Sequence, residues 1–215
     1  MIITYLSHEA FKIQFGETVI ALNPVSKESK LKGAKFGADI ALISLNDPDF
    51  NGVENVTHGE RAPFAITGPG EYEIKGIFIK GFKSPSHYGL KAGDKDARIN
   101  TIYTVTLEGM NICVLGATDS KELSTEANEA IEDIDILFVP IGGEGVLSAA
   151  AGYELAVKLE PRLIIPMHYE GASDKNLKAF LKEAGEEGTK PIDKLTLKKK
   201  DLDGKEGEIV VLQEQ

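Results

Sequence analysis

Short apolar runs, separated by turn-forming residues, dominate the first half of the chain and predict β-strands. They lie at residues 18–22, 38–45, 72–80, 101–107 and 111–115. The run at 38–45 has a nearly continuous apolar centre, which is typical of a strand covered on both faces. Gly76 interrupts the alternation of its run and predicts a bulge or bend, whereas Glu108–Gly109 predicts the turn of a hairpin.

The second half alternates between helical and strand patterns. Helices are predicted at 124–131, 148–159 and 174–184, with strands at 135–140 and 162–167. A last hairpin is predicted from 194–197 and 208–212, with its turn at Asp203–Gly204. The pattern therefore predicts an α+β fold of about ten strands and at least three helices, in which two sheets pack face to face with helices outside. Residues 1–215 are expected to form a single domain.

Composition narrows the classes of partner and compartment. The chain has 24 basic and 34 acidic side chains, so its net charge of −10 disfavours nucleic acid as a partner. There is neither an apolar run long enough to span a membrane nor a signal-peptide pattern, so we expect no membrane association. The single cysteine, Cys113, suits a reducing compartment, and we expect a cytoplasmic protein.

Histidines and aspartates near strand ends are the candidates for chemistry. His168 directly follows the apolar strand at 162–167, and His87 lies in a turn-rich loop; each is either a site residue or a structural one. Asp47 and Asp49 lie two apart on an irregular loop, where they either converge on a cation or simply form a turn. His8 is interpreted as structural, because it sits where a strand turns back.

Four longer segments resemble the metallo-β-lactamase superfamily, in particular the branch of ascorbate-6-phosphate lactonases and related zinc-dependent hydrolases. They are ITYLSHEAFKI at 3–13, VIALNP at 19–24, DIDILFVPIGG at 133–143 and KLEPRLIIPMHY at 158–169. The first resembles a strand where a Gly-His-Ser/Ala-Phe pattern is usual, and the second resembles one that normally ends Ile-Asp-Pro. The resemblance implies an αββα sandwich of two similar halves.

The resemblance also implies a dinuclear zinc site, but the expected ligands are mostly missing. The family's His-x-His-x-Asp-His loop aligns with Leu45-Asn-Asp-Pro-Asp-Phe50, so that only Asp49 keeps its type and Asp47 is a replacement carboxylate. His87 and His168 fall where two further histidine ligands are expected. Ala117 stands where the bridging aspartate should follow Gly116, and Asp119 lies two residues further along. The remaining candidate ligands are therefore Asp49, His87 and His168, with Asp47 and Asp119 as weaker ones.

Zinc needs about four close donors, and leucine and phenylalanine supply none. The sequence therefore favours a non-catalytic protein that has lost its dinuclear site, carries no cofactor, and binds an unidentified small molecule or protein. The alternative is a hydrolase of lactones, esters or phosphoesters with a remodelled site for one zinc, manganese or iron ion. A third hypothesis is an interaction module, including a homo-oligomer, that uses a surface away from this site.

Overall fold

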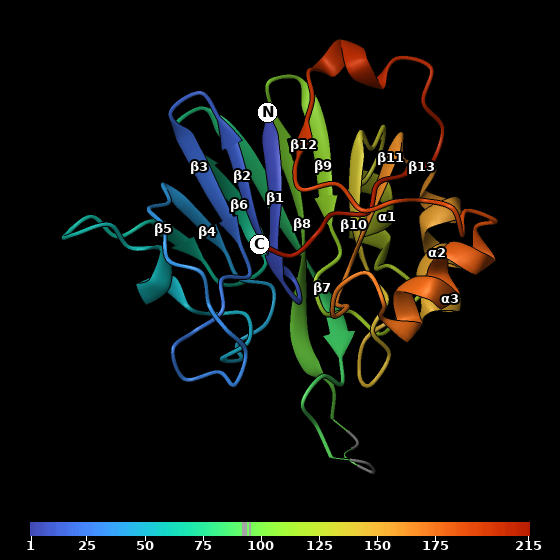
Figure 1. Ribbon diagram of the computed structural model, residues 1–215. Helices are drawn as coiled ribbons and strands as arrows, with labels where there is room; N and C mark the ends of the chain where they lie inside the picture. Colours follow the sequence, from blue (N-terminus) through green and yellow to red (C-terminus); the bar gives the residue numbers. More distant parts are fainter. Residues whose placement is uncertain (92–93, 95) are drawn as a thin grey trace.

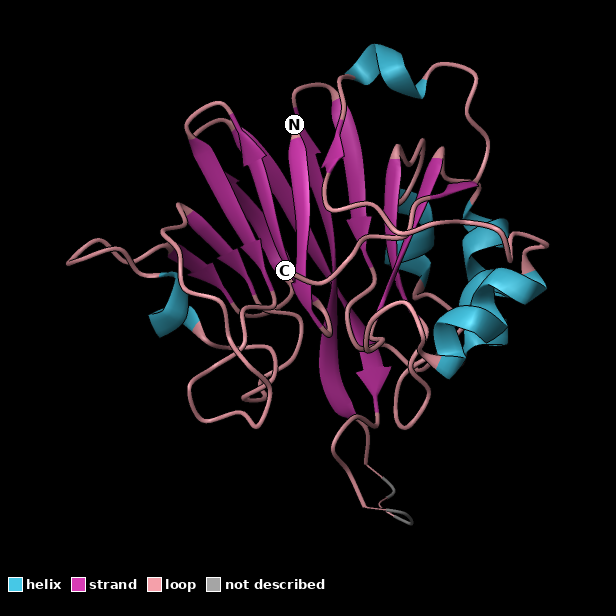
Figure 2. Cartoon of the chain, viewed as in Figure 1, coloured by secondary structure: helices cyan, strands magenta, loops and turns pink. Residues whose placement is uncertain are grey.

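Two β-sheets pack face to face across a shared apolar core, in a computed structural model that describes residues 1–91, 94 and 96–215 (Figures 1 and 2). The core includes Ile3 and Ile13 from one sheet and Ile102 and Ile136 from the other, all of which are buried. This is the predicted α+β sandwich, because strands of both sheets contribute buried apolar side chains to one core.

The first sheet has six strands, and the three that come first in the sequence form an antiparallel meander. Their order across the sheet is β12 (Leu195–Thr196), β1 (Ile2–Ser7), β2 (Ala10–Phe15), β3 (Thr18–Leu22), β4 (Ile40–Leu42) and β5 (Phe64–Ile66). Strands β3, β4 and β5 run parallel to one another. The predicted strand at 18–22 has these bounds in the structure, whereas only the centre of the predicted strand at 38–45 is paired.

The second sheet has seven strands, of which four pair antiparallel in sequence order and the other three add a parallel segment. Their order is β13 (Glu208–Ile209), β11 (Leu163–Met167), β10 (Ile136–Pro140), β9 (Met110–Val114), β8 (Arg98–Leu107), β7 (Ile77–Ser86) and β6 (Gly70–Ile74). The predicted hairpin around Glu108–Gly109 is confirmed as β8–β9. Strands β10 and β11 are buried along their whole length, as their continuous apolar sequences predict.

Three α-helices lie beside β10 and β11 in Figure 1, and all three were predicted. They are α1 (Thr125–Ala130), α2 (Ala149–Leu159) and α3 (Lys175–Glu183). Each begins after a side chain that accepts a backbone hydrogen bond: the Ser124 and Ser148 hydroxyls, and the Asp174 carboxylate. Helix α2 packs on α3, where Tyr153 meets Phe180 edge to face.

The outer face of the first sheet is covered differently. A short 3-10 helix, η1 (Val53–Val56), and the extended segment around Phe36 and Ala38 pack there against Ala21 and Ala41. Small side chains on this face allow the covering backbone to approach closely, so an irregular segment takes the place that a helix occupies on the other sheet.

Two predictions about turns were wrong. The run at 72–80 is a hairpin rather than one bent strand, because Lys75 and Gly76 both adopt left-handed backbone angles, with φ of 55° and 74°, as a tight two-residue turn requires. The predicted C-terminal hairpin does not form. Strand β12 pairs with β1, β13 pairs with β11, and the 3-10 helix η2 (Lys199–Leu202) lies between them. Each segment instead completes the edge of a different sheet, a choice that local turn signals do not determine.

The segment around β12 is hydrogen-bonded to the first residues of the sequence. The backbone N–H of Leu197 donates to the carbonyl of Met1 at 3.0 Å, next to the β1–β12 pairing. None of the helices in the described part of the chain has the length and apolar character needed to cross a bilayer.

Candidate functional site

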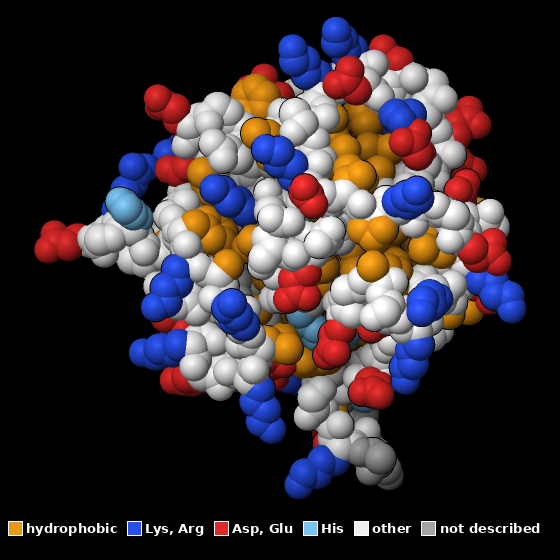
Figure 3. All heavy atoms as spheres, in the orientation of Figure 1, with side chains coloured by type: hydrophobic (Ala, Val, Ile, Leu, Met, Phe, Trp, Pro, Cys, Tyr) orange, Lys and Arg blue, Asp and Glu red, His pale blue; other side chains and the backbone are white. Residues whose placement is uncertain are grey.

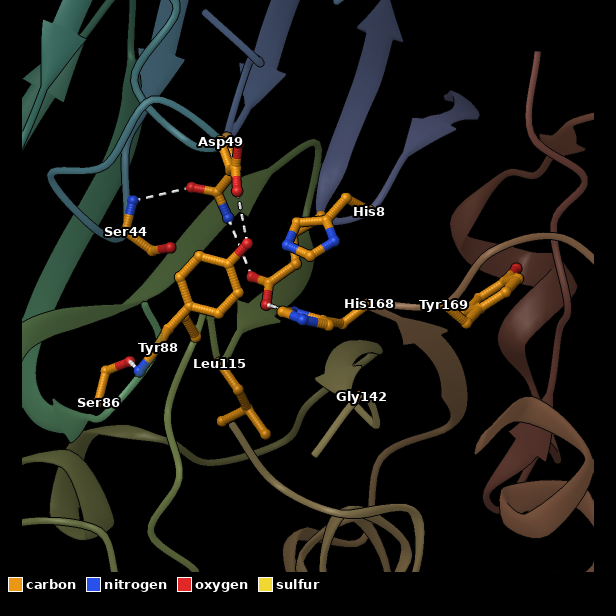
Figure 4. Close-up of polar contacts among 12 residues, drawn as sticks. His8, Ser44, Asp49, Ser86, Tyr88, Leu115, Gly142, His168 and Tyr169 are labelled. Carbon is orange, nitrogen blue, oxygen red and sulfur yellow. Dashed lines mark hydrogen bonds and ion pairs between the residues drawn. The ribbon is translucent and has the colours of Figure 1, made fainter. Parts of the chain in front are cut away.

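A pocket of about 1010 Å³ opens at one end of the sandwich, where the loops after β1, β4, β7, β10 and β11 meet. Because these strands end at the same edge of the two sheets, residues far apart in sequence come together there. Among the lining residues are His8, Asp47, Asp49, His87, Tyr88, Glu144, His168 and Asp174. Figure 4 shows Tyr88, His8 and His168 converging from three different loops.

The positions where the family resemblance expects metal ligands hold a packed apolar cluster. Leu45 and Phe50, from the loop after β4, are buried against Ala117 and Val146, and the half-buried ring of Tyr88 packs on them. The rings of Phe50 and Tyr88 meet edge to face with centroids 5.1 Å apart. This part of the site is therefore apolar and buried, which agrees with the loss of donors that the sequence predicted at Leu45 and Phe50.

The two aspartates of the same loop have partners from the protein itself. The Arg98 guanidinium donates to Oδ2 of Asp47 at 2.8 Å, so this carboxylate already has a cation. Asp49 accepts a hydrogen bond from the Tyr88 hydroxyl at 2.5 Å and another from the Ser29 hydroxyl. Burial and the hydrogen bond to Asp49 both raise the pKa of Tyr88, so the phenol stays protonated and keeps donating.

His87 and Asp119 form a pair at the mouth of the pocket. Nδ1 of His87 is bonded to Oδ2 of Asp119, and 43% of the His87 side chain is exposed. Asp119 therefore does not replace the missing aspartate at Ala117; it orients His87 instead. The Gly145 carbonyl accepts from the His87 backbone N–H at 3.1 Å, which places the loop after β10 directly over this pair.

His168 is held by a buried polar network that begins in the first sheet. Its Nδ1 lies 2.8 Å from Oε1 of Glu9, and Oε2 of Glu9 accepts a hydrogen bond from the side-chain amide of Asn23 at 3.3 Å. The backbone N–H of Ser44 in turn donates to Oδ1 of Asn23 at 2.8 Å. This line of contacts joins the ends of β1, β3 and β4 to the end of β11, and Figure 4 shows it between the labelled residues Ser44 and His168.

His8 lies directly against His168, with ring centroids 3.8 Å apart. The backbone N–H of His168 donates to the carbonyl of His8 at 2.6 Å, which joins the end of β1 to the end of β11 across the two sheets. Both residues have left-handed backbone angles, with φ of 52° and 66°. Non-glycine residues in this conformation are strained and are concentrated at functional sites.

Burial sets the protonation of this inner group. It lowers the pKa of His168 and of His8 to about 4, and the neighbouring His168 adds to the effect on His8. It raises the pKa of the Glu9 carboxyl to about 8. Both imidazoles are therefore neutral at physiological pH. Nε2 of His8 is buried and has no hydrogen-bond partner among the described residues.

These residues do not fit the dinuclear metal centre that the fold family implies. Within residues 1–91, 94 and 96–215, no group of three His, Cys, Asp or Glu side chains is arranged to hold a metal ion. Asp47 is paired with Arg98 and Asp49 with Tyr88, and three of the expected ligand positions carry hydrocarbon side chains. A catalytic zinc typically needs three protein donors at one point, and this arrangement does not supply them.

Sequence reasoning identified most of this region but missed three of its residues. Asp47, Asp49, His87 and His168 line the pocket, and Asp119 reaches it through His87; whether any of them binds a metal stays a prediction. His8, Glu9 and Tyr88 were not selected. A signal for the first two existed, because His8 keeps the histidine of the Gly-His-Ser/Ala-Phe pattern while Glu9 departs from it.

Comparisons with known proteins agree with the fold. The family model described as "Beta-lactamase superfamily domain" matches residues 2–168. A UPF0173 metal-dependent hydrolase of Pyrococcus abyssi is 30% identical over 66% of this chain, and one of Pyrococcus horikoshii is 29% identical over 69%. The matched regions span 58% and 61% of those two proteins, so the chain covers less than two thirds of their length.

Solved structures extend the similarity over the whole chain. A protein of the metallo-beta-lactamase superfamily from Thermotoga maritima is 26% identical, covers 100% of this chain and 99% of its own, and has a TM-score of 0.76. A metallo hydrolase from Ignicoccus hospitalis shares the fold at 16% identity, covers 99% of this chain and 94% of its own, and has a TM-score of 0.60.

Proposed function

The chain belongs to the metallo-β-lactamase superfamily, and from this premise we propose that it binds a small molecule without the superfamily's pair of metal ions. The observation that carries the proposal is the packing of Leu45, Phe50 and Ala117 into a buried apolar cluster at positions where metal ligands are expected. The scaffold and its pocket remain, while the donors that would hold two cations do not.

The pairing of the two aspartates supports the same proposal. A carboxylate that binds a metal ion must offer its oxygens to that ion. Here Arg98 donates to Asp47, and Tyr88 donates to Asp49. Contacts within the protein therefore compete for the oxygens that a metal ion would need.

Metal analysis is the direct test. The full chain is exposed to zinc, manganese or iron and dialysed, and its metal content is then measured. We expect no stoichiometric metal in the unmodified protein. The matched variant carries Leu45→His, Phe50→His and Ala117→Asp together, which returns three donors to one place. This variant is expected to retain metal, provided that circular dichroism shows it to be folded.

The second candidate is the remodelled hydrolase with one metal ion, and a specific observation favours it. Nε2 of His8 is buried without a partner beside His168, and an unpaired imidazole nitrogen is a ready metal ligand. Two of the relatives are themselves named metal-dependent hydrolases. Stoichiometric binding of one ion by the unmodified protein, lost in His168→Ala together with hydrolysis of an ester or lactone panel, would establish this candidate and refute our proposal.

A further inference from the structure

We propose that the ligand of this pocket is an organic cation, an amine or quaternary ammonium compound, bound by carboxylates and aromatic rings together. The inference rests on the proposed function, because it takes the pocket to bind a small molecule without metal. It is carried by three observations about the pocket: the excess of carboxylates, the rings at its base, and the Nε2 atom of His168, which has no partner among the described residues.

Carboxylates dominate the charge of the pocket. Its described lining contains six of them against two lysines: Asp47, Asp49, Asp94, Glu144, Glu170 and Asp174, against Lys91 and Lys175. Among the described residues, Arg98 forms an ion pair with Asp47 and with none of the other five carboxylates. In Figure 3, histidine atoms are visible in a hollow near the lower centre, with acidic side chains close by. This charge balance attracts a cation and opposes phosphate or carboxylate ligands.

Three of these carboxylates reach the pocket from separate loops. Asp49 follows β4, Glu144 follows β10 and Asp174 follows β11, and all three line the pocket together with His168. A ligand that carries its own positive charge would therefore have carboxylates on several sides.

Aromatic rings form the base of the pocket. Tyr88, His8 and His168 all line it, and their ring centroids lie between 3.8 and 5.5 Å from one another. Tyr88 is the ring suited to a cation–π contact, which favours a cation within about 6 Å of a tyrosine centroid. Its hydroxyl is directed to Asp49, so the ring and the carboxylate form one unit.

The imidazole of His168 leaves hydrogen-bonding capacity for a ligand. Its side chain is 10% exposed, its Nδ1 is held by Glu9, and its Nε2 has no hydrogen bond to the described residues. A bare metal ion would need three converging donors, which the described residues do not offer. An ammonium compound needs only carboxylates around it and a ring beneath it.

The test compares choline with 3,3-dimethylbutan-1-ol, which has the same shape without the charge, and with inorganic phosphate. Binding to the full chain is measured by titration calorimetry in buffer free of added metal. We expect choline to bind with a Kd in the millimolar range or tighter, and roughly tenfold more tightly than the neutral alcohol. Phosphate is expected not to bind, and higher salt should weaken the binding of choline.

Variants identify the place of binding. Tyr88→Leu removes the ring and should weaken choline binding roughly tenfold, whereas Tyr88→Phe keeps the ring and should stay within about twofold. Glu144→Gln should weaken binding by roughly twofold to fivefold. Glu129→Gln, on the exposed face of α1, removes an equal charge outside the pocket and should leave the Kd unchanged. Thermal unfolding of each variant verifies that it is folded.

The outcomes separate this inference from the proposed function. Equal binding of choline and the neutral alcohol, tighter binding of phosphate, or no saturable binding of choline would overturn the organic cation. None of these results would be evidence for a metal centre. Stoichiometric metal in the unmodified protein would instead overturn the proposed function itself, whatever choline does.

Discussion

Glu9 and His168 are 159 positions apart in sequence, yet Oε1 of Glu9 lies 2.8 Å from Nδ1 of His168. Glu9 is fully buried, and its other oxygen is bonded to Asn23. A buried carboxyl is tolerated only when it is hydrogen-bonded, so this contact links the positions of both residues. It also fixes the ring of His168 at the base of the pocket, between the two sheets.

Removing Glu9 should therefore destabilise the fold. Glu9→Ala leaves the Asn23 amide and Nδ1 of His168 buried without partners, which should lower the free energy of unfolding by about 1–3 kcal/mol. Glu9→Gln should cost much less, because its oxygen can accept from Asn23 while its amide donates to His168. Urea unfolding of the two variants and the unmodified chain measures the difference. Equal stability of Glu9→Ala and the unmodified chain would contradict this account of the network.

The same residues predict a stability maximum near pH 6.5. His8 and His168 have pKa values of about 4 when folded against 6.5 in a model compound, so the unfolded chain binds more protons there and stability rises as the pH increases from 4 to 6.5. Glu9 has a pKa of about 8 when folded against 4.5, so the folded chain binds more protons and stability falls as the pH increases from 4.5 to 8.

Below pH 6.5 the effect of the two histidines on stability is larger than that of Glu9. Above pH 6.5 Glu9 is the one of these three groups that still changes stability. Each group contributes up to about 1.4 kcal/mol per pH unit within its window. Urea unfolding across this range, compared with Glu9→Gln, isolates the alkaline limb, because glutamine does not titrate. A decline above pH 6.5 that is just as steep in Glu9→Gln would assign it to other groups.

Phe50 should be among the costliest residues to truncate. Its side chain is fully buried against His8 and Tyr88, so Phe50→Ala should lower the free energy of unfolding by about 3–5 kcal/mol. Phe64, on strand β5, is 53% exposed and provides a matched control. Phe64→Ala should change stability by about 0.5 kcal/mol. Similar losses in the two variants would show that the apolar cluster at Phe50 is not a packed core.

Gly142 should tolerate no side chain. A Cβ atom added there would lie 2.1 Å from Cδ2 of His168, so Gly142→Ala should displace that ring and cost about 1–3 kcal/mol. Gly188→Ala is the control, because an added Cβ at Gly188 meets nothing within 4 Å. Thermal unfolding compares the two variants. We also expect the histidine ring signals of Gly142→Ala to shift in NMR spectra, and unchanged signals would argue against the close contact.

The sequence predicted the elements better than their partners. Local patterns predict the helices that begin near Ser124 and Ser148, the apolar strands β10 and β11, and the loss of donors at Leu45 and Phe50. His8 was interpreted as structural because it lies where a strand turns back, which is visible in the local sequence. Its contact with His168 depends instead on how the ends of β1 and β11 meet in space. Glu9, in the same way, acquires its role only from the opposite sheet.

The turn signals show the same limit. Asp203–Gly204 has the composition of a hairpin turn, yet β12 and β13 join separate sheets. Gly76 was expected to bend one strand and instead forms a two-residue turn with Lys75. Residue preferences describe the backbone angles available at a position. Which segments pair depends on where edge strands present unpaired N–H and C=O groups.

The pairing of β12 with β1 has a consequence for synthesis on the ribosome. Ile2 is partnered by Thr196, so the outer side of β1 stays uncovered until residue 196 has emerged from the ribosome. The nascent chain must therefore carry an open strand while all the residues between β1 and β12 are made, which invites wrong pairing with neighbouring chains. A stalled or truncated product that ends before residue 195 would keep that edge bare and should be a substrate for chaperones and proteases.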